Sequence, residues 1–151
     1  MNEVEIKINI LDHGAKELPK YETSGSSGMD LKAAINNPII LKKNERKIIP
    51  TGIKVEIPKG YEIQIRPRSG LAIKYGITIL NSPGTIDSDY RGEIGIITIN
   101  HGNEDFKIMP NDRIAQMVIA KIIYAKISKV DKLSDTKRGS KGYGSTGKNN
   151  E

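Results

Sequence analysis

Residues Asn81–Glu93, reading NSPGTIDSDYRGE, combine turn-forming residues with side chains that can do chemistry. The Ser82-Pro83-Gly84 run predicts a turn, because proline presets φ and glycine tolerates positive φ. Strand-like stretches precede and follow this segment, so we expect Asp87 and Tyr90 to lie on an exposed β-hairpin. An exposed carboxylate there can deprotonate a water molecule beside a ligand that packs on the ring. An aspartate that only serves the turn is the alternative.

Three other segments place polar side chains where strands begin or end. Arg68-Ser69-Gly70 brings a guanidinium, a hydroxyl and unhindered N–H groups to the end of a strand, which suits a phosphate group. A strand end with an exposed arginine is the alternative. Asp30 follows a Gly/Ser run, where a cap or an ion pair is the simpler interpretation. Gln116 borders an apolar stretch, where an amide at the edge of the core is the simpler interpretation.

The composition indicates one domain whose core is aliphatic. The chain has 151 residues, of which 36% are hydrophobic and only 5% aromatic. With no Cys and only two His, it offers neither thiolate chemistry nor a zinc site, and we expect a cytoplasmic protein. No apolar stretch is long enough to span a membrane.

The net charge of +6 does not by itself predict nucleic-acid binding. Residues 126–151 hold seven Lys or Arg against three Asp or Glu, so most of the excess lies in this C-terminal arm. A basic arm is usually a solvated tail, and the sharper hypothesis is an arm that closes on a small polyanion. Direct nucleic-acid binding by a β-barrel is also disfavoured, because single-strand binders stack bases on aromatic rings and only 5% of the residues in this chain are aromatic.

Alternating apolar and polar residues predict an all-β fold. Residues 53–57 and 63–65 alternate in this way, with a turn at Pro58-Lys59-Gly60 between them. Residues 39–41 and 47–49 flank a polar turn and predict another hairpin. Further strands are expected at 4–11 and 117–124, and one short helix near 71–75. Many short strands between turns are typical of a sandwich or barrel.

Five segments taken together, in this order, closely resemble the five motifs of the trimeric deoxyuridine triphosphatase (dUTPase) family. The resemblance covers nearly the whole chain and is far more specific than any one segment. The segments are SSGMDLKA (Ser26–Ala33), RPRSGLA (Arg66–Ala72), NSPGTIDSDYRGE (Asn81–Glu93), DRIAQM (Asp112–Met117) and RGSKGYGSTG (Arg138–Gly147).

The resemblance implies a role for each candidate residue. It makes Asp87 the catalytic base, and it has the Tyr90 ring pack on deoxyribose so that no 2′-hydroxyl fits. Asp30 would help to anchor, through water, a Mg²⁺ ion carried mainly by the substrate phosphates, while Asp89 is left a structural role. The implied substrate-binding residues are Arg68, Ser69, Gly70, Asn81, Thr85, Ile86, Asp87, Tyr90, Gly95, Gln116, Arg138 and Tyr143.

The C-terminal arm is interpreted in the same way. Residues 142–148 match GxxxxGK, but Asn149 stands where a P-loop needs Ser or Thr and too few residues follow for a helix. We therefore expect a flexible flap in which Arg138 contacts phosphate and Tyr143 stacks on the base. Lys141 stands where the family usually has Gly, and Tyr143 where it usually has Phe. Asn111 replaces a Gly before DRIAQ and tolerates positive φ.

The resemblance thus implies a distorted jelly-roll or β-barrel-like subunit, with residues 1–125 as the catalytic domain and 126–151 as the arm. The implied assembly is a homotrimer with active sites at subunit interfaces. The implied reaction is Mg²⁺-dependent hydrolysis of dUTP to dUMP and pyrophosphate, which limits uracil in DNA and supplies dUMP for thymidylate synthesis. A dCTP deaminase-like enzyme on the same fold and a non-catalytic nucleotide-binding regulator are the alternatives.

Overall fold

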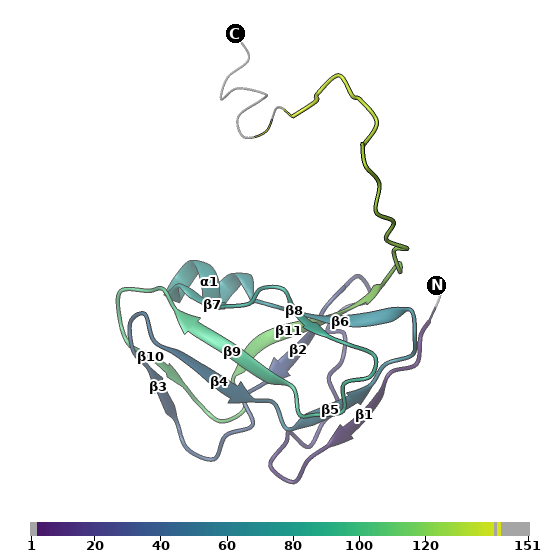
Figure 1. Ribbon diagram of the computed structural model, residues 1–151. Coiled ribbons are helices and arrows are strands. Elements are labelled where there is room, and N and C mark those ends of the chain that lie inside the picture. The colour runs from purple at the N-terminus through teal and green to yellow at the C-terminus, as the bar shows by residue number, and fades with distance from the viewer. Residues whose placement is uncertain (1–2, 141, 143–151) are drawn as a thin grey trace.

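The computed structural model describes residues 3–140 and 142, which form a β-rich body with one short helix (Figure 1). The strands and the helix, in chain order, are β1 (Lys7–Ile10), β2 (Met29–Lys32), β3 (Ile39–Leu41), β4 (Arg46–Pro50), β5 (Ile53–Glu56), β6 (Tyr61–Arg66), α1 (Ser69–Tyr75), β7 (Ile77–Ile79), β8 (Gly84–Ile86), β9 (Gly95–Asn100), β10 (Phe106–Ile108) and β11 (Arg113–Lys121). This jelly-roll-like arrangement confirms the predicted all-β class, and the short helix lies where it was expected.

Two main sheets enclose the core. One has the strand order β2-β11-β6-β8 and the other the order β4-β9-β7, while β1-β5 and β3-β10 form two-stranded ribbons. Alternation decides which side chains face inward: Ile63 and Ile65 of β6 are buried, and the intervening Gln64 is only partly so. Isoleucines from both sheets join one cluster with Met117, so aliphatic side chains fill the interior as the composition predicted.

The predicted hairpin of residues 39–41 and 47–49 is wrong. Both stretches are strands and a turn joins them, but β3 pairs with β10 and β4 pairs with β9. The turn is held locally, because the Lys42 N–H donates to the Glu45 carboxylate (2.8 Å) and Asn44 takes a φ of 60°. A polar turn therefore shows where the chain reverses, but it does not fix the partner of each strand.

The expected hairpin around Asp87 is present in a modified form. Strands β7 and β9 pair antiparallel, with Ile77 opposite Asn100 and Ile79 opposite Thr98. The segment between them is not a simple loop, because its strand β8 crosses to the other sheet and pairs with β6. The candidate residues on this segment are therefore fixed to both sheets.

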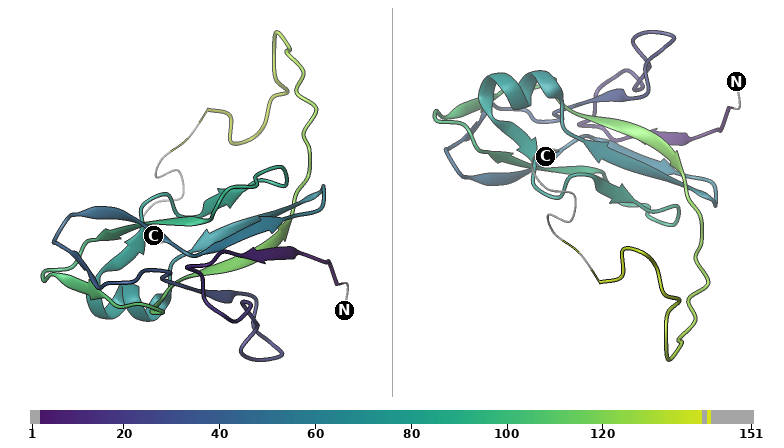
Figure 2. Two further views of the ribbon diagram at one scale, coloured as in Figure 1. Left: turned by 90° about the horizontal axis from the view of Figure 1, so that it is seen from below. Right: turned by 90° about the horizontal axis from the view of Figure 1, so that it is seen from above.

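The last strand ends at Lys121, and the chain then leaves the body as an extended segment (Figure 1). Residues 123–140 are exposed throughout. Figure 2 shows α1 at one end of the body and β1 toward the other, with this segment running outside both sheets. No helix in residues 3–140 is long and apolar enough to cross a membrane.

Candidate active site

The site hairpin, which we define as residues 80–95, carries Asp87 on its outer surface. Asp87 follows β8 directly, and its carbonyl accepts the N–H of Tyr90 (3.1 Å) to close a tight turn. Both Asp87 and Asp89 are exposed, and they line a hollow together with Glu62 of β6 and Tyr124 at the start of the arm. The carboxylate of Asp87 is thus open to solvent on a rigid backbone, as a water-activating group requires.

The Tyr90 ring is held in one place by its own hairpin. Its hydroxyl donates a hydrogen bond to the carbonyl oxygen of Glu93 (2.9 Å). The ring lies over Gly92, where an added Cβ would overlap the phenol group. The side chain nevertheless remains 43% exposed. One face of a fixed aromatic ring is therefore available to pack on a ligand.

The other hairpin candidates lie along the same segment. Asn81 and Thr85 are exposed, while Ile86 is half-buried beside β6. Gly95 is exposed at the start of β9, and an added Cβ there would come within 2.7 Å of an Ile48 methyl carbon. Contact with Ile48 is therefore a structural reason for a glycine at this position.

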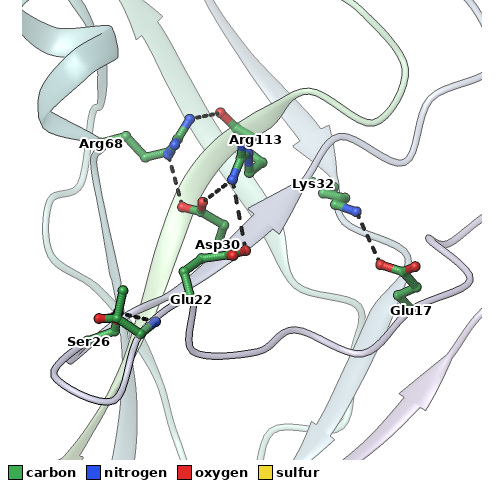
Figure 3. A network of polar contacts seen from close by, with 8 residues as sticks. Glu17, Glu22, Ser26, Asp30, Lys32, Arg68 and Arg113 are labelled. Atoms are coloured by element: carbon green, nitrogen blue, oxygen red, sulfur yellow. Dashed lines mark hydrogen bonds and ion pairs between the residues drawn. The ribbon is translucent and has the colours of Figure 1, made fainter.

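A second group, which we call the phosphate clamp, lies where β2, β11 and α1 meet (Figure 3). Asp30 of β2 sits between Arg68 and Arg113: Oδ1 accepts from Arg68 Nε (2.9 Å) and Oδ2 lies 3.4 Å from Arg113 Nη1. Arg68 Nη1 also donates to the Arg113 carbonyl (2.9 Å). The ion-pair interpretation of Asp30 is therefore correct, and the pair fixes the direction of the Arg68 guanidinium.

The remaining phosphate-binding candidates border this clamp. Ser69 and Gly70 open α1 and are exposed, and the first N–H groups of a helix have no partner within it. Gln116 of β11 donates to the Pro67 carbonyl (3.0 Å), which fixes the chain just before Arg68. Two candidates from distant parts of the sequence thus hold this segment: Asp30 contacts the Arg68 guanidinium, and Gln116 bonds the backbone just before it.

Arg113 is a clamp residue that the sequence analysis did not single out. It belongs to the DRIAQM segment, three positions before Gln116, and its charge was the available signal. Its proximity to Asp30 depends on β2 pairing with β11, where the register shifts between Arg113 and Ala115. Asn111, just before this strand, has a φ of 67°, as expected for a residue that replaces glycine.

Asp87 and the phosphate clamp lie far apart within this chain. Strand β8 pairs with β6 so that Ile86 faces Ile63, which places Asp87 beside Glu62. Arg68 lies six residues further along the chain, a separation of about 20 Å at the rise of a β-strand. Within this chain, Asp87 therefore does not lie beside Arg68.

The structure gives a partial view of the arm. Arg138 is exposed within a turn in which the Gly139 N–H donates to the Thr136 carbonyl (3.1 Å). Tyr143 and Lys141 lie outside the described residues.

Among residues 3–140 and 142, no three His, Asp or Glu side chains gather as a metal-binding group. A metal ion here would need most of its ligands from elsewhere.

The chain matches the dUTPase family model over residues 15–147. It is 64% identical over 130 residues to the deoxyuridine 5′-triphosphate nucleotidohydrolase of Treponema denticola, covering 86% of this chain and 90% of that protein. It is 56% identical over 148 residues to the enzyme of the same name from Fusobacterium nucleatum, covering 98% and 100%.

Solved structures show the same fold. The dUTPase of Staphylococcus bacteriophage 80alpha, solved with dUpNHpp, matches with a TM-score of 0.84 and 26% identity over 95% of this chain and 98% of that chain. A mutant dUTPase from phage phi11 of S. aureus, described for its coordination of a structural Mg(II) ion, matches with a TM-score of 0.77 and 22% identity over 87% and 100%.

Proposed function

The chain belongs to the dUTPase family and hydrolyses dUTP to dUMP and pyrophosphate, and we propose that Asp87 is the base that activates the attacking water. The observation that carries this role is an exposed carboxylate on a residue whose backbone is held: the Asp87 carbonyl accepts the Tyr90 N–H, and the segment pairs with both sheets. Water deprotonated by Asp87 attacks the α-phosphorus, and pyrophosphate leaves. A positioned base of this kind contributes roughly 10²–10⁴ in rate.

The hairpin binds the nucleoside. Tyr90 packs on the deoxyribose and leaves no room for a 2′-hydroxyl. Asn81 has a donor and an acceptor for the uracil edge, and backbone groups at Thr85, Ile86 and Gly95 complete the slot. The fixed ring of Tyr90 and the exposed position of Asn81 support this assignment.

The clamp binds the phosphates. Arg68, Ser69 and Gly70 hold the chain of phosphates at the start of α1, with Gln116 beside them. A guanidinium held in place before the substrate arrives needs no reorganisation as negative charge develops. The ion pair with Asp30 supports this role for Arg68.

Mg²⁺ is the proposed cofactor, carried mainly by the substrate phosphates. This ion keeps several water ligands and needs only one or two carboxylates, so the lack of a metal-binding cluster among residues 3–140 fits it. Asp30, whose side chain is 20% exposed, would contact a metal-bound water with lone pairs that the arginines leave open. When bound, the ion neutralises charge on the phosphates.

The active enzyme is a homotrimer whose sites combine the hairpin of one subunit with the clamp of another. The separation of about 20 Å between Asp87 and Arg68 along β6 supports a shared site.

A third contribution comes from the arm, residues 126–151, as a unit distinct from the catalytic domain of residues 1–125. Nineteen residues separate Tyr124 from Tyr143, and an extended segment of that length reaches about 60 Å. Arg138 and Tyr143 would then close over a neighbour's nucleotide. We also place the enzyme in the cytoplasm.

One substrate panel tests this assignment against the alternatives. Pyrophosphate release with Mg²⁺ should be fast for dUTP and slow for dTTP, dCTP and UTP. Ammonia release from dCTP would instead identify a deaminase. Tight dUTP binding with no pyrophosphate release would identify a binding protein without catalysis.

A further inference from the structure

The carboxylate of Glu93 joins three separate parts of the chain. Its Oε1 accepts the N–H of Gly52 (2.7 Å), and Nε2 of His13 lies 2.9 Å from the same oxygen. The side chain is 29% exposed, so solvent screens these contacts only in part. The backbone carbonyl of Glu93 also accepts the hydrogen bond from the Tyr90 hydroxyl. Its side chain and its backbone therefore connect the body of the subunit to the ring in the nucleotide slot.

The partners of this carboxylate are themselves firmly held. Gly52 has a φ of 66°, a conformation that favours glycine, and its carbonyl accepts the N–H of Leu11 (2.8 Å). The backbones of Gly14 and Gly52 approach so closely that a Cβ on either would overlap the other. The turn that carries His13 thus packs directly on Gly52, and both donors face Glu93 from a fixed direction.

The position of the Tyr90 ring depends on Gly92 and Glu93. The ring lies over Gly92, its hydroxyl reaches the Glu93 carbonyl, and the Tyr90 N–H closes the turn with Asp87. A rotation of the Glu93 peptide would move the hydroxyl's acceptor and release the ring. The Glu93 side chain, bonded to Gly52, opposes that rotation.

From this arrangement we infer that Glu93 is a positioning residue for Tyr90 and so sets the preference of the site for deoxyribose over ribose. The inference rests on the proposed packing of Tyr90 against the sugar. Glu93 does not contact the substrate. It acts by keeping the ring where a 2′-hydroxyl would collide with it, and His13 contacts the same carboxylate oxygen as Gly52.

The test measures kcat/KM for dUTP and UTP by pyrophosphate release in full-length variants. Glu93→Ala should lower the dUTP-over-UTP ratio about tenfold, because a hydrogen bond to a charged acceptor is lost. Glu93→Gln keeps an oxygen that can accept the Gly52 N–H, so its ratio should stay within about threefold of wild type. Tyr90→Phe removes the hydroxyl and should also lower the ratio.

Two controls separate positioning from a general loss of stability. Glu56→Ala removes a carboxylate that pairs with Lys7 (2.9 Å) on an exposed surface, and it should leave the ratio unchanged. In the Tyr90→Phe background, Glu93→Ala should add little further loss, since both act through one hydrogen bond. If the alanine variant does not fold, Glu93→Asp keeps the charge but shortens the reach to Gly52 and should lower the ratio in its place.

The inference is overturned if the folded Glu93→Ala variant, or Glu93→Asp in its place, keeps the ratio within about twofold of wild type, the usual limit of independent effects. It is also overturned if Glu93→Ala exerts its full effect in the Tyr90→Phe background, or if Tyr90→Phe leaves the ratio unchanged. Failure of the proposed function would look different, because wild type itself would then fail to prefer dUTP.

Discussion

Replacing Asp30 by asparagine tests how the phosphate clamp is held. Asn keeps the size of the side chain and one acceptor oxygen, but it removes the charge between Arg68 and Arg113. Its amide group would also direct a donor at one guanidinium. We expect Arg68 to lose its fixed direction toward the phosphates while the fold survives, because the clamp lies at the surface.

The magnitude follows from the geometry of the pair. A hydrogen bond between charged groups contributes roughly 1.5–3 kcal/mol. The Arg68 and Asp30 side chains are 31% and 20% exposed, so solvent screening brings the figure to about 2 kcal/mol. If the transition state loses this stabilisation of about 2 kcal/mol, kcat/KM for dUTP should fall about 30-fold.

The assay compares pyrophosphate release by Asp30→Asn, Arg68→Ala and the double variant, with thermal denaturation to verify folding. Because Asp30 acts through Arg68, the double variant should be little worse than Arg68→Ala alone. Glu17→Gln is the matched control, since it alters an exposed carboxylate 3.9 Å from Lys32 and should change nothing.

Two results would refute the reasoning. A kcat/KM of Asp30→Asn within about threefold of wild type would mean that the pair does not orient the guanidinium. Fully additive losses in the double variant would mean that Asp30 acts on its own. Recovery of Asp30→Asn at high Mg²⁺ would then assign its role to the metal-bound water.

Three further predictions concern the base, the arm and a turn. Asp87→Asn should bind dUTP as wild type does but lose roughly 10²–10⁴ in kcat, and near-normal turnover would remove Asp87 from the role of base. Deleting residues 138–151 should leave the circular dichroism spectrum and melting temperature unchanged but impair hydrolysis, and normal turnover would contradict the flap. The pKa of Glu45 is lowered by hydrogen bonds from the Lys42 N–H and from Lys47, so its folded-state pKa lies below its unfolded value. Its contribution to stability is therefore present above the ordinary glutamate pKa of about 4.3 and is lost as the pH falls below that value. Glu45→Gln should accordingly show a smaller drop in melting temperature between pH 7 and pH 3 than wild type. An equal drop in the two proteins would show that the charge of Glu45 does not contribute.

Local patterns were sufficient to predict most of the strands and the helix. Alternation in 53–57 and 63–65 reports which side chains face the core, and this is a property of the strand itself. Strand partners are different, because pairing is decided by the whole sheet. The turn after Leu41 was recognised, yet its two strands pair with β10 and β9, which lie more than forty residues further along the chain.

The candidate site was predictable where its residues are neighbours in sequence. The hairpin candidates lie on one segment, and their exposure follows from the turn residues around them. The contacts of Asp30 with Arg68 and Arg113 join residues as many as 83 positions apart, and the pairing of β11 with both β2 and β6 brings them together. For the same reason no local signal connects His13 to Glu93.

Subunit complementation tests most directly the claim that the hairpin base and the phosphate clamp meet across subunits. Asp87→Asn and Arg68→Ala chains, each nearly inactive alone, are unfolded together in equal amounts, refolded and assayed for pyrophosphate release. If each site takes its hairpin and its clamp from different copies, random assembly gives about a quarter of wild-type activity, because about one site in four receives both native groups. A mixture no more active than its two components would mean that both groups act within one subunit, and the shared site would be wrong.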